Sequence, residues 1–224
     1  MTEGKEQQQP PWAQRLHDVL LPVLRHQIER FGIETTGAYN FYKVRAETGQ
    51  IFMQYEIELA RKLLASGLGI RHIHEIGSGF GQLMFLMGWN GFRTLGFEAD
   101  RARARTARTL RAILDLVDPQ LTENVHLHEG EFPSGGALHP EPGSLVLTTN
   151  LVATRSLPQQ LDILKAMRKY PFVLADMQRF FELRPDPAQE PEALALFARA
   201  GFEDPELFLD LGAGGRYYLF VNSL

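Results

Sequence analysis

The chain of 224 residues contains no cysteine. Disulfide bonds, thiolate metal sites and a cysteine nucleophile are therefore excluded, and the composition is compatible with a reducing, cytoplasmic setting. No part of the sequence approaches the roughly 18 uninterrupted apolar residues of a membrane-spanning helix, and the polar N-terminal segment lacks the pattern of a secretory signal. We expect a soluble, cytoplasmic protein that does not enter a membrane.

The chain also lacks a strong net charge: 23 Lys and Arg stand against 27 Asp and Glu, and the pI is near 6.0. Such a balance gives no general attraction to nucleic acid or to anionic membranes. The run "RARARTARTLR" places Arg101, Arg105 and Arg108 at one-turn intervals of a helix. We interpret this run as a solvated helix face whose arginine stems cover the edge of the core, with a nucleic-acid contact as the alternative.

The apolar content of 44% is enough for one substantial core. We expect a disordered leader over residues 1–11, a helical cap or lid over 12–66, and a cofactor-binding domain over 67–224. Within the cap, apolar residues recur at helical spacing over 12–31 and 49–66.

From residue 70 onward, short apolar runs alternate with helix-length patterns, which is typical of a doubly wound, Rossmann-like α/β fold with a mostly parallel sheet. The ending "PELFLDLGAGGRYYLFVNSL" predicts an antiparallel hairpin added to that sheet, whose parallel strands follow the order 3-2-1-4-5. The predicted strands cover 71–76, 93–98, 124–128, 145–149 and 172–176. The predicted helices between them cover 82–89, 100–117, 158–170 and 191–200.

The stretch "HEIGSGFGQLM", residues 74–84, puts a glycine-rich turn directly after the first strand of this sheet. Ligands of open α/β sheets bind at such turns. A dinucleotide fingerprint would have glycine at the position of Gln82, and Glu75 would place negative charge beside a pyrophosphate. A ligand with a cationic end and no phosphate reverses this electrostatic preference, and S-adenosylmethionine is such a ligand.

With these residues the sequence resembles the class I S-adenosylmethionine-dependent methyltransferases, whose first motif reads acid-x-Gly-x-Gly-x-Gly. The motif is matched in full by Glu75, Gly77, Ser78, Gly79 and Gly81 with their neighbours. The resemblance implies further contacts at later strand ends, but the Pro-Pro-Tyr signature of base-methylating members is absent. The implied contacts are Glu98 with both ribose hydroxyls, Ala99 against the adenine, Glu131 and Phe132 near the adenine, and Asn150 near the transferring methyl group.

We predict that loss of Glu98 would weaken the cofactor and leave the fold intact, with little change in the melting temperature if the side chain is solvent-facing at its strand end. The family often uses segments before the first strand as a lid, and a polar, aromatic loop stands there in this chain. Arg45 or Lys43 could pair with the cofactor carboxylate, and a tyrosine such as Tyr39 could face the sulfonium. Core packing of these aromatics is the alternative.

No residue is singled out as catalytic. Methyl transfer from a sulfonium needs mainly alignment and exclusion of water. If the acceptor requires a base, Asp176, Tyr39 or His139 could supply it, although a structural strand-end role suits Asp176 better. The pairs His72/His74 and His126/His128 belong to strands that are not neighbours, so we predict no metal site.

The most economical interpretation is an S-adenosylmethionine-dependent methyltransferase that acts on an oxygen or nitrogen atom of a small-molecule acceptor. Two alternatives stay open: a nicotinamide-dependent oxidoreductase, and a non-catalytic cofactor-binding or interaction module on the same fold. Glu75 and Gln82 weigh against the nicotinamide enzyme. A partner other than a small molecule is not indicated by the sequence, and the oligomeric state is not encoded in any pattern we recognise.

Overall fold

A computed structural model describes residues 11–31, 47–133, 140–149, 155–181 and 184–222. The chain separates into two units, residues 1–53 and 54–224. In the first unit, helix α1 (Pro11–Phe31) matches the predicted helix 12–31. His17 Nε2 lies 2.7 Å from the carbonyl oxygen of Gly49, which links α1 to the segment that follows at residue 47. The predicted leader, residues 1–11, falls almost entirely outside the described residues.

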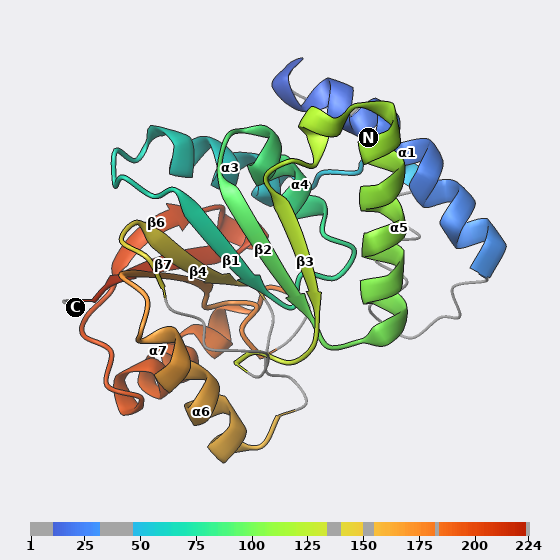
Figure 1. Cartoon of the computed structure of the whole chain (residues 1–224). Helices are drawn as coiled ribbons and strands as arrows, with labels where there is room; N and C mark the ends of the chain where they lie inside the picture. The colour runs from blue at the N-terminus through green and yellow to red at the C-terminus, as the bar shows by residue number, and fades with distance from the viewer. Residues whose placement is uncertain (1–10, 32–46, 134–139, 150–154, 182–183, 223–224) are drawn as a thin grey trace, which may run out of the picture. The chain divides into compact units, whose positions relative to one another are not determined.

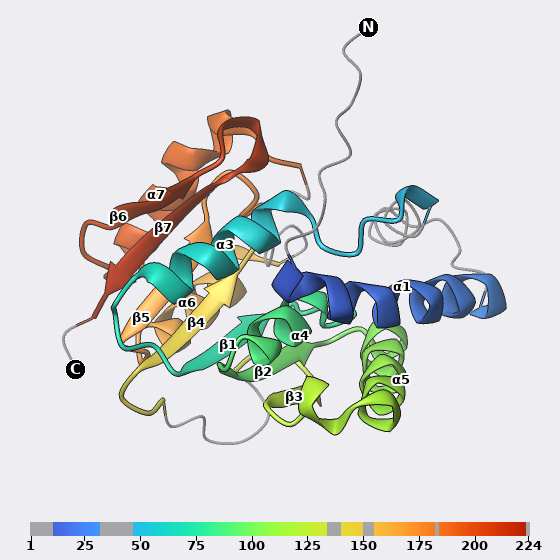
Figure 2. The same ribbon diagram turned by 90° about the horizontal axis from the view of Figure 1, so that it is seen from above.

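The second unit is built on a seven-stranded sheet of order β3-β2-β1-β4-β5-β7-β6 (Figures 1 and 2). The first five strands pair in parallel, whereas β7 pairs antiparallel with both β5 and β6. This confirms the predicted fold class, the 3-2-1-4-5 order and the terminal hairpin. The strands are β1 (His72–Ile76), β2 (Arg93–Glu98), β3 (Val125–Glu129), β4 (Ser144–Thr148), β5 (Phe172–Asp176), β6 (Glu206–Asp210) and β7 (Arg216–Val221).

Helices cover both faces of the sheet, as the crossover connections of parallel strands require (Figure 1). Helices α4 and α5 pack on the face of β2 and β3, and α3 contacts α4, while α6 and α7 cover the opposite face. Short 3₁₀ turns cover Pro119–Leu121, Pro187–Gln189 and Gly212–Gly214. The helices are α3 (Gln54–Ala65), α4 (Gln82–Trp89), α5 (Arg101–Val117), α6 (Leu157–Met167) and α7 (Glu190–Arg199).

Two helices of the second unit begin directly after residues that cap them. Helix α5 begins after Asp100, whose side chain accepts a hydrogen bond from the Arg103 backbone N–H at 2.9 Å. Helix α6 begins after Ser156, which forms a capping box with Gln159. The second predicted helix starts five residues later than expected, at Gln54 rather than 49, because residues 51–53 form a bend.

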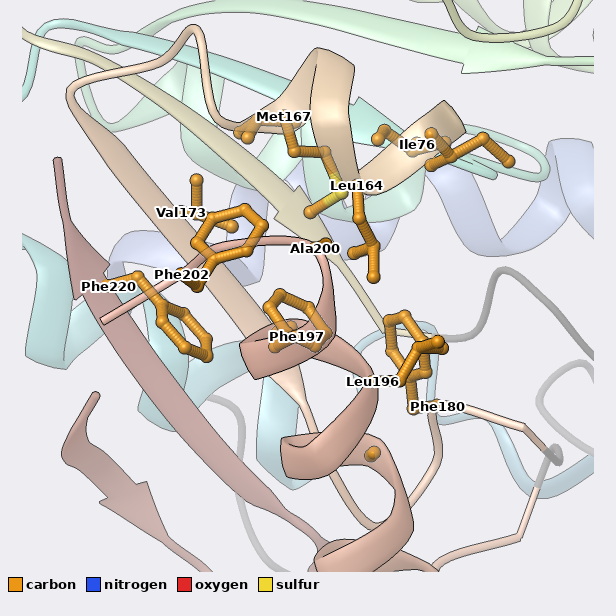
Figure 3. Packing of buried hydrophobic residues seen from close by; sticks show 14 of the residues in the cluster. Ile76, Leu164, Met167, Val173, Phe180, Leu196, Phe197, Ala200, Phe202 and Phe220 are labelled. Carbon is orange, nitrogen blue, oxygen red and sulfur yellow. The ribbon is translucent and has the colours of Figure 1, made fainter. Parts of the chain in front are cut away.

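The core between the sheet and the pair α6 and α7 is strongly aromatic (Figure 3). The rings of Phe197 and Phe220 are stacked with centroids 4.7 Å apart, and Phe202 lies edge-on to Phe220 at 5.0 Å. Burial of such rings is the main stabilising contribution here. The core fixes β5 and β7 side by side and thereby sets the carboxyl edge of the sheet. Its labelled members are Ile76, Leu164, Met167, Val173, Phe180, Leu196, Phe197, Ala200, Phe202 and Phe220.

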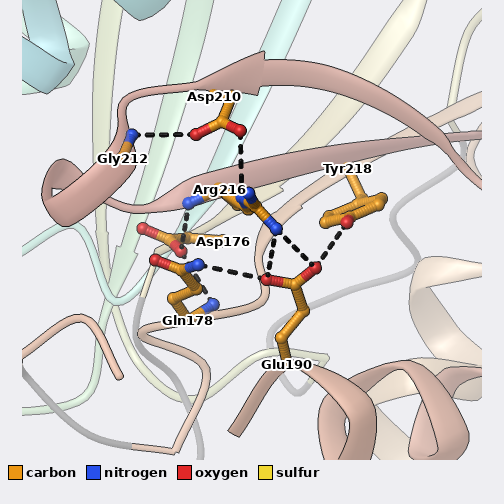
Figure 4. A network of polar contacts seen from close by, with 7 residues as sticks. All are labelled: Asp176, Gln178, Glu190, Asp210, Gly212, Arg216 and Tyr218. Atoms are coloured by element: carbon orange, nitrogen blue, oxygen red, sulfur yellow. Dashed lines mark hydrogen bonds and ion pairs between the residues drawn. The ribbon is translucent and has the colours of Figure 1, made fainter. Parts of the chain in front are cut away.

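A polar network joins the C-terminal hairpin to the start of α7 and to the segment after β5 (Figure 4). The Tyr218 hydroxyl donates to Glu190 Oε1 at 2.6 Å, and the Gln178 amide donates to Glu190 Oε2 at 3.1 Å. Arg216 lies between two carboxylates, with its Nε 3.0 Å from Asp210 and its Nη1 3.4 Å from Glu190. The network therefore holds the beginning of β7 against the end of β5.

Candidate cofactor site

The glycine turn after β1 is held against the end of β2. The backbone N–H groups of Gly77 and Ser78 both donate to the carbonyl oxygen of Phe97, at 2.9 and 3.0 Å. Gly77, Gly79 and Gly81 have φ angles of 75°, 59° and 80°. Side chains with a Cβ rarely adopt this left-handed region, so the spacing of the three glycines is what allows the turn.

Glu98, at the end of β2, binds this turn directly. Its Oε2 accepts a hydrogen bond from the Gly79 N–H at 2.8 Å, and its Oε1 accepts one from the Asp100 N–H at 2.8 Å. Arg103 Nη2 lies 3.6 Å from Oε1. The residue is 4% exposed, so the condition under which its loss would leave the melting temperature unchanged, a solvent-facing side chain, is not met. A carboxylate has about four acceptor positions, which leaves capacity for a ligand hydroxyl.

Glu75 is the second buried carboxylate of the site, with 7% exposure. Within the sheet, Glu75 pairs in register with Gly96 of the neighbouring strand β2. A Cβ on Gly96 would lie 2.7 Å from Ser78 Oγ and 2.8 Å from Ser78 Cβ, so only glycine fits there. A glycine inside a strand marks close backbone or side-chain approach, and this signal in "TLGFEAD" could have identified Gly96 as part of the site.

In sequence comparisons, no protein-family model and no curated protein matches the chain. Solved structures do match it. A TehB-like S-adenosylmethionine-dependent methyltransferase from Corynebacterium glutamicum superposes with a TM-score of 0.58 at 14% identity, covering 89% of this chain and 99% of that protein. Human N-acetylserotonin methyltransferase in complex with S-adenosylmethionine gives 0.52 at 15%, covering 92% and 66%. Monomeric WbdD gives 0.55 at 14%, and 76% of this chain corresponds to only 42% of WbdD.

The chain has the class I S-adenosylmethionine-dependent methyltransferase fold. Within the methyltransferase fold, the glycine turn, Glu75 and Glu98 come together at the carboxyl ends of β1 and β2, as the sequence predicted. Arg103, which the sequence analysis did not select, is the third residue of α5 and pairs with Glu98. The sequence feature that could have identified Arg103 is its position in the first turn of the helix that follows Glu98.

The residues of the later motifs differ in how far they are exposed to solvent. Ala99 is exposed directly after β2. Glu131 is also exposed, and its Oε1 is bound by Arg155 Nη2 at 3.1 Å, which lowers the pKa of the carboxyl. Phe132 is buried in the aromatic core, with its ring centroid 5.6 Å from that of Phe97. The predicted adenine contacts of these residues stay predictions.

Several predicted residues lie outside the part of the chain that the structure describes. Asn150, predicted near the transferring methyl group, is one of them. The others are the candidate bases Tyr39 and His139 and the lid residues Lys43 and Arg45. The predicted boundary at residue 67 concerns a functional cap, and it is not tested by the division after Met53.

The histidine pairs have packing partners. His74 Nδ1 lies 2.7 Å from the Tyr170 hydroxyl, and burial lowers the pKa of His74 to about 4, so the ring is neutral at pH 7. The His128 ring packs edge-on against Phe97 at 5.4 Å. His74 and His126 are separated by Leu95 of the intervening strand. Within the described ranges, no group of three or more His, Cys, Asp or Glu side chains could hold a metal ion.

Two arginines of α5 are engaged with an acid at the end of β3. Arg101 Nε donates to Glu129 Oε1 at 3.0 Å, and Arg108 Nη2 donates to Glu129 Oε2 at 2.6 Å. Both bonds lower the pKa of Glu129. This pairing supports the interpretation of the run as a helix face that covers the edge of the sheet.

Among the described helices, none is long and apolar enough to cross a membrane.

Asp176, the candidate base at the end of β5, is fully buried and serves as an internal hydrogen-bond acceptor. Its Oδ1 accepts from the backbone N–H groups of Gln178, Arg179 and Arg216 at 3.0, 3.2 and 3.3 Å. Its Oδ2 pairs with Arg179 Nη1 at 3.2 Å. A Cβ on Gly215, whose φ is 109°, would collide with this carboxylate. These contacts support the structural role that the sequence analysis preferred.

Burial raises the pKa of Asp176 to about 6, against the opposing effects of Arg179 and the backbone N–H groups. In an unfolded chain the value is about 3.9. The raised pKa means that Asp176 favours folding most below about pH 4, and that this contribution is lost as the pH rises through about 6. As the pH rises from about 4 to about 6, the free energy of unfolding of wild type should therefore decrease relative to that of Asp176→Asn. Urea unfolding of both proteins across this range tests the trend.

Asp204→Asn is the matched control, because Asp204 is exposed. Its difference from wild type should not change across the same pH range. A wild-type advantage over Asp176→Asn that grows as the pH rises would contradict the assignment of a raised pKa.

Proposed function

We propose that the protein is an S-adenosylmethionine-dependent methyltransferase that acts on an oxygen or nitrogen atom of a small molecule. The observation that carries this proposal is the pair of buried carboxylates, Glu75 and Glu98, on either side of the glycine turn. Buried acids beside close-approach glycines suit a ligand with hydroxyl groups and a cationic end. The methyltransferase fold favours that ligand, but a fold does not by itself specify an activity.

Glu75 and Gln82 weigh against a nicotinamide dinucleotide. A pyrophosphate at this turn would face the negative charge of Glu75 in a buried setting, where electrostatic interactions are strong. Gln82, the first residue of α4, is 4% exposed and occupies the position where a dinucleotide fingerprint needs glycine for close packing of helix and strand. We therefore favour the sulfonium cofactor over the nicotinamide cofactor.

In the proposed site, Glu98 binds the ribose hydroxyls, and Glu75 and the glycine turn hold the amino-acid end of the cofactor. S-adenosylmethionine supplies a methyl group that is already activated by the sulfonium. The protein then needs to orient the acceptor and exclude water, and no covalent intermediate is required. Asp176 keeps its acceptor positions for internal hydrogen bonds, so we do not assign it as the base.

A small molecule is proposed as the acceptor rather than nucleic acid. Arg101, Arg103 and Arg108 are paired with Glu129 and Glu98, so much of the positive charge of α5 is neutralised within the protein. The net charge of −4 also opposes binding to a polyanion. We place the enzyme in the cytoplasm as part of this proposal, on the composition alone.

The proposal is tested by incubating the protein with S-adenosylmethionine that carries a deuterated methyl group and with a fractionated metabolite extract. Mass spectrometry then follows the formation of S-adenosylhomocysteine and the labelled mass shift in an acceptor. We expect both signals to appear together and to depend on intact protein. Cofactor binding without any labelled product across the fractions would favour the non-catalytic module.

A further inference from the structure

The carboxyl edge of the sheet carries a second group of polar side chains, next to the proposed cofactor site. Asp176 at the end of β5 pairs in register with Tyr217 at the start of β7. The order β1-β4-β5 places this group two strands from the glycine turn, which is about 10 Å at the usual strand spacing. A methyl acceptor must lie beside the cofactor, and ligands of this fold class occupy the carboxyl edge.

The guanidinium of Arg179 is held rigidly in this group. Its Nη1 pairs with Asp176 Oδ2 at 3.2 Å, and its carbon lies 4.4 Å above the ring centroid of Tyr55, at the start of α3. The guanidinium therefore lies over an aromatic ring, and one of its nitrogens is paired with a carboxylate that is 0% exposed. A side chain fixed at two points loses little further freedom when it binds a ligand.

Among the described residues, Arg179 keeps hydrogen-bond donors that this group does not use. A guanidinium has five N–H donors, and Asp176 is the one hydrogen-bond acceptor that Arg179 has among the described residues. Asp176 itself is occupied by three backbone N–H groups and by Arg179. Burial raises the pKa of Tyr217 well above its ordinary value, so its hydroxyl stays neutral. A ligand with acceptor atoms can therefore bind the N–H groups of Arg179 that Asp176 does not accept.

We infer that Arg179 binds a carboxylate group of the methyl acceptor, so that the substrate class is a small carboxylic acid with a nucleophilic oxygen or nitrogen atom. The planar fork of a guanidinium matches a carboxylate with two parallel hydrogen bonds. Two buried or half-buried tyrosines beside it provide a low-dielectric environment in which this interaction is strong. The inference rests on the proposed function for the identity of the neighbouring cofactor.

Benzoate and its neutral analogue benzamide are suitable probes, titrated by calorimetry into protein saturated with S-adenosylhomocysteine at pH 7.5. Wild type should bind benzoate saturably and benzamide at least about tenfold more weakly, since the analogue lacks the charge-assisted pair. Arg179→Gln should weaken benzoate binding at least about tenfold. Arg179→Lys should lose less, because it keeps the charge but not the fork.

Arg105→Gln is the matched control, because Arg105 is an exposed arginine on α5. It should bind benzoate as wild type does. A titration of each variant with S-adenosylhomocysteine separates the two proposals: its affinity should stay within about twofold in Arg179→Gln, because the residue does not touch the cofactor turn. If no variant binds S-adenosylhomocysteine, the proposed function fails, and the benzoate titration is then made on ligand-free protein.

Should Arg179→Gln fail to fold, the wild-type protein still decides the question. The Nε–H resonance of Arg179 in a nitrogen-15 spectrum, identified by its loss in Arg179→Lys, should shift as benzoate is added and should not shift with benzamide. An absence of saturable benzoate binding to wild type overturns the inference. Equal benzoate affinity in wild type and folded Arg179→Gln overturns it as well.

Discussion

Glu98→Ala is expected to weaken the binding of S-adenosylhomocysteine by about 2 to 4 kcal/mol, because it removes two charge-assisted hydrogen bonds to the ribose. The same change should also lower the melting temperature of the ligand-free protein. The side chain is 4% exposed and accepts hydrogen bonds from Gly79 and Asp100. Alanine leaves both of these backbone N–H groups without their acceptor, and each such loss costs about 1 to 3 kcal/mol when the group is buried.

Glu98→Gln should fall between wild type and alanine in both measurements. Its amide oxygen can accept one of the two backbone hydrogen bonds, whereas its NH₂ group faces the other donor. Calorimetry and ligand-free melting of the three proteins give the comparison.

Glu129→Ala provides the control, because Glu129 pairs in register with Glu98 at the end of the adjacent strand and is bonded to arginine side chains instead of the turn. It should leave the cofactor affinity close to that of wild type. Equal affinity in wild type, Glu98→Gln and Glu98→Ala would remove the ribose contact from the account.

Gly79→Val is expected to abolish measurable cofactor binding. Gly79 has a φ of 59°, which a β-branched residue adopts only with strain, and its N–H is bonded to Glu98. A valine that moved the backbone to a negative φ would break this bond and displace the glycine turn. Titration with S-adenosylhomocysteine, alongside circular dichroism to establish folding, measures the effect.

The matched control is Gly91→Val, because Gly91 also has a positive φ, of 91°, and a Cβ there would meet no atom within 4 Å. Gly91 lies between α4 and β2, at the amino end of the strand, away from the glycine turn. Its replacement should reduce stability through backbone strain while the cofactor affinity is kept. Comparable affinity loss in both folded variants would show that strain alone explains the effect at Gly79.

The sheet could be predicted from the sequence because each strand is a short apolar run bounded by turn residues. Strands β2 and β5 match their predicted ranges, β1 begins one residue later than predicted, and β3 and β4 are each shifted by one residue. The start of α3 could not be predicted as well. Ile51 and Phe52 fit a helical spacing, yet they lie in a bend before Gln54. Spacing alone does not separate a buried bend from the first turn of a helix.

The candidate site was predictable where a local motif defines it and unpredictable where tertiary packing does. The glycine turn and Glu98 are close because a first-strand motif and a second-strand end meet in any sheet of this order. The burial of Glu98 depends on Arg103 and on the turn itself, which no local pattern reports. The packing of the Phe132 ring against Phe97 in the core is another tertiary contact that no local pattern reports, and its predicted adenine contact stays a prediction.

The most direct test of the central claim is calorimetry of the wild-type protein with S-adenosylmethionine, S-adenosylhomocysteine and NAD in parallel. The account predicts saturable binding of both sulfur ligands at one site, with no measurable binding of NAD, because Glu75 opposes a pyrophosphate beside the turn and Gln82 stands where a dinucleotide fingerprint needs glycine. Binding of NAD without a response to either sulfur ligand would contradict the account.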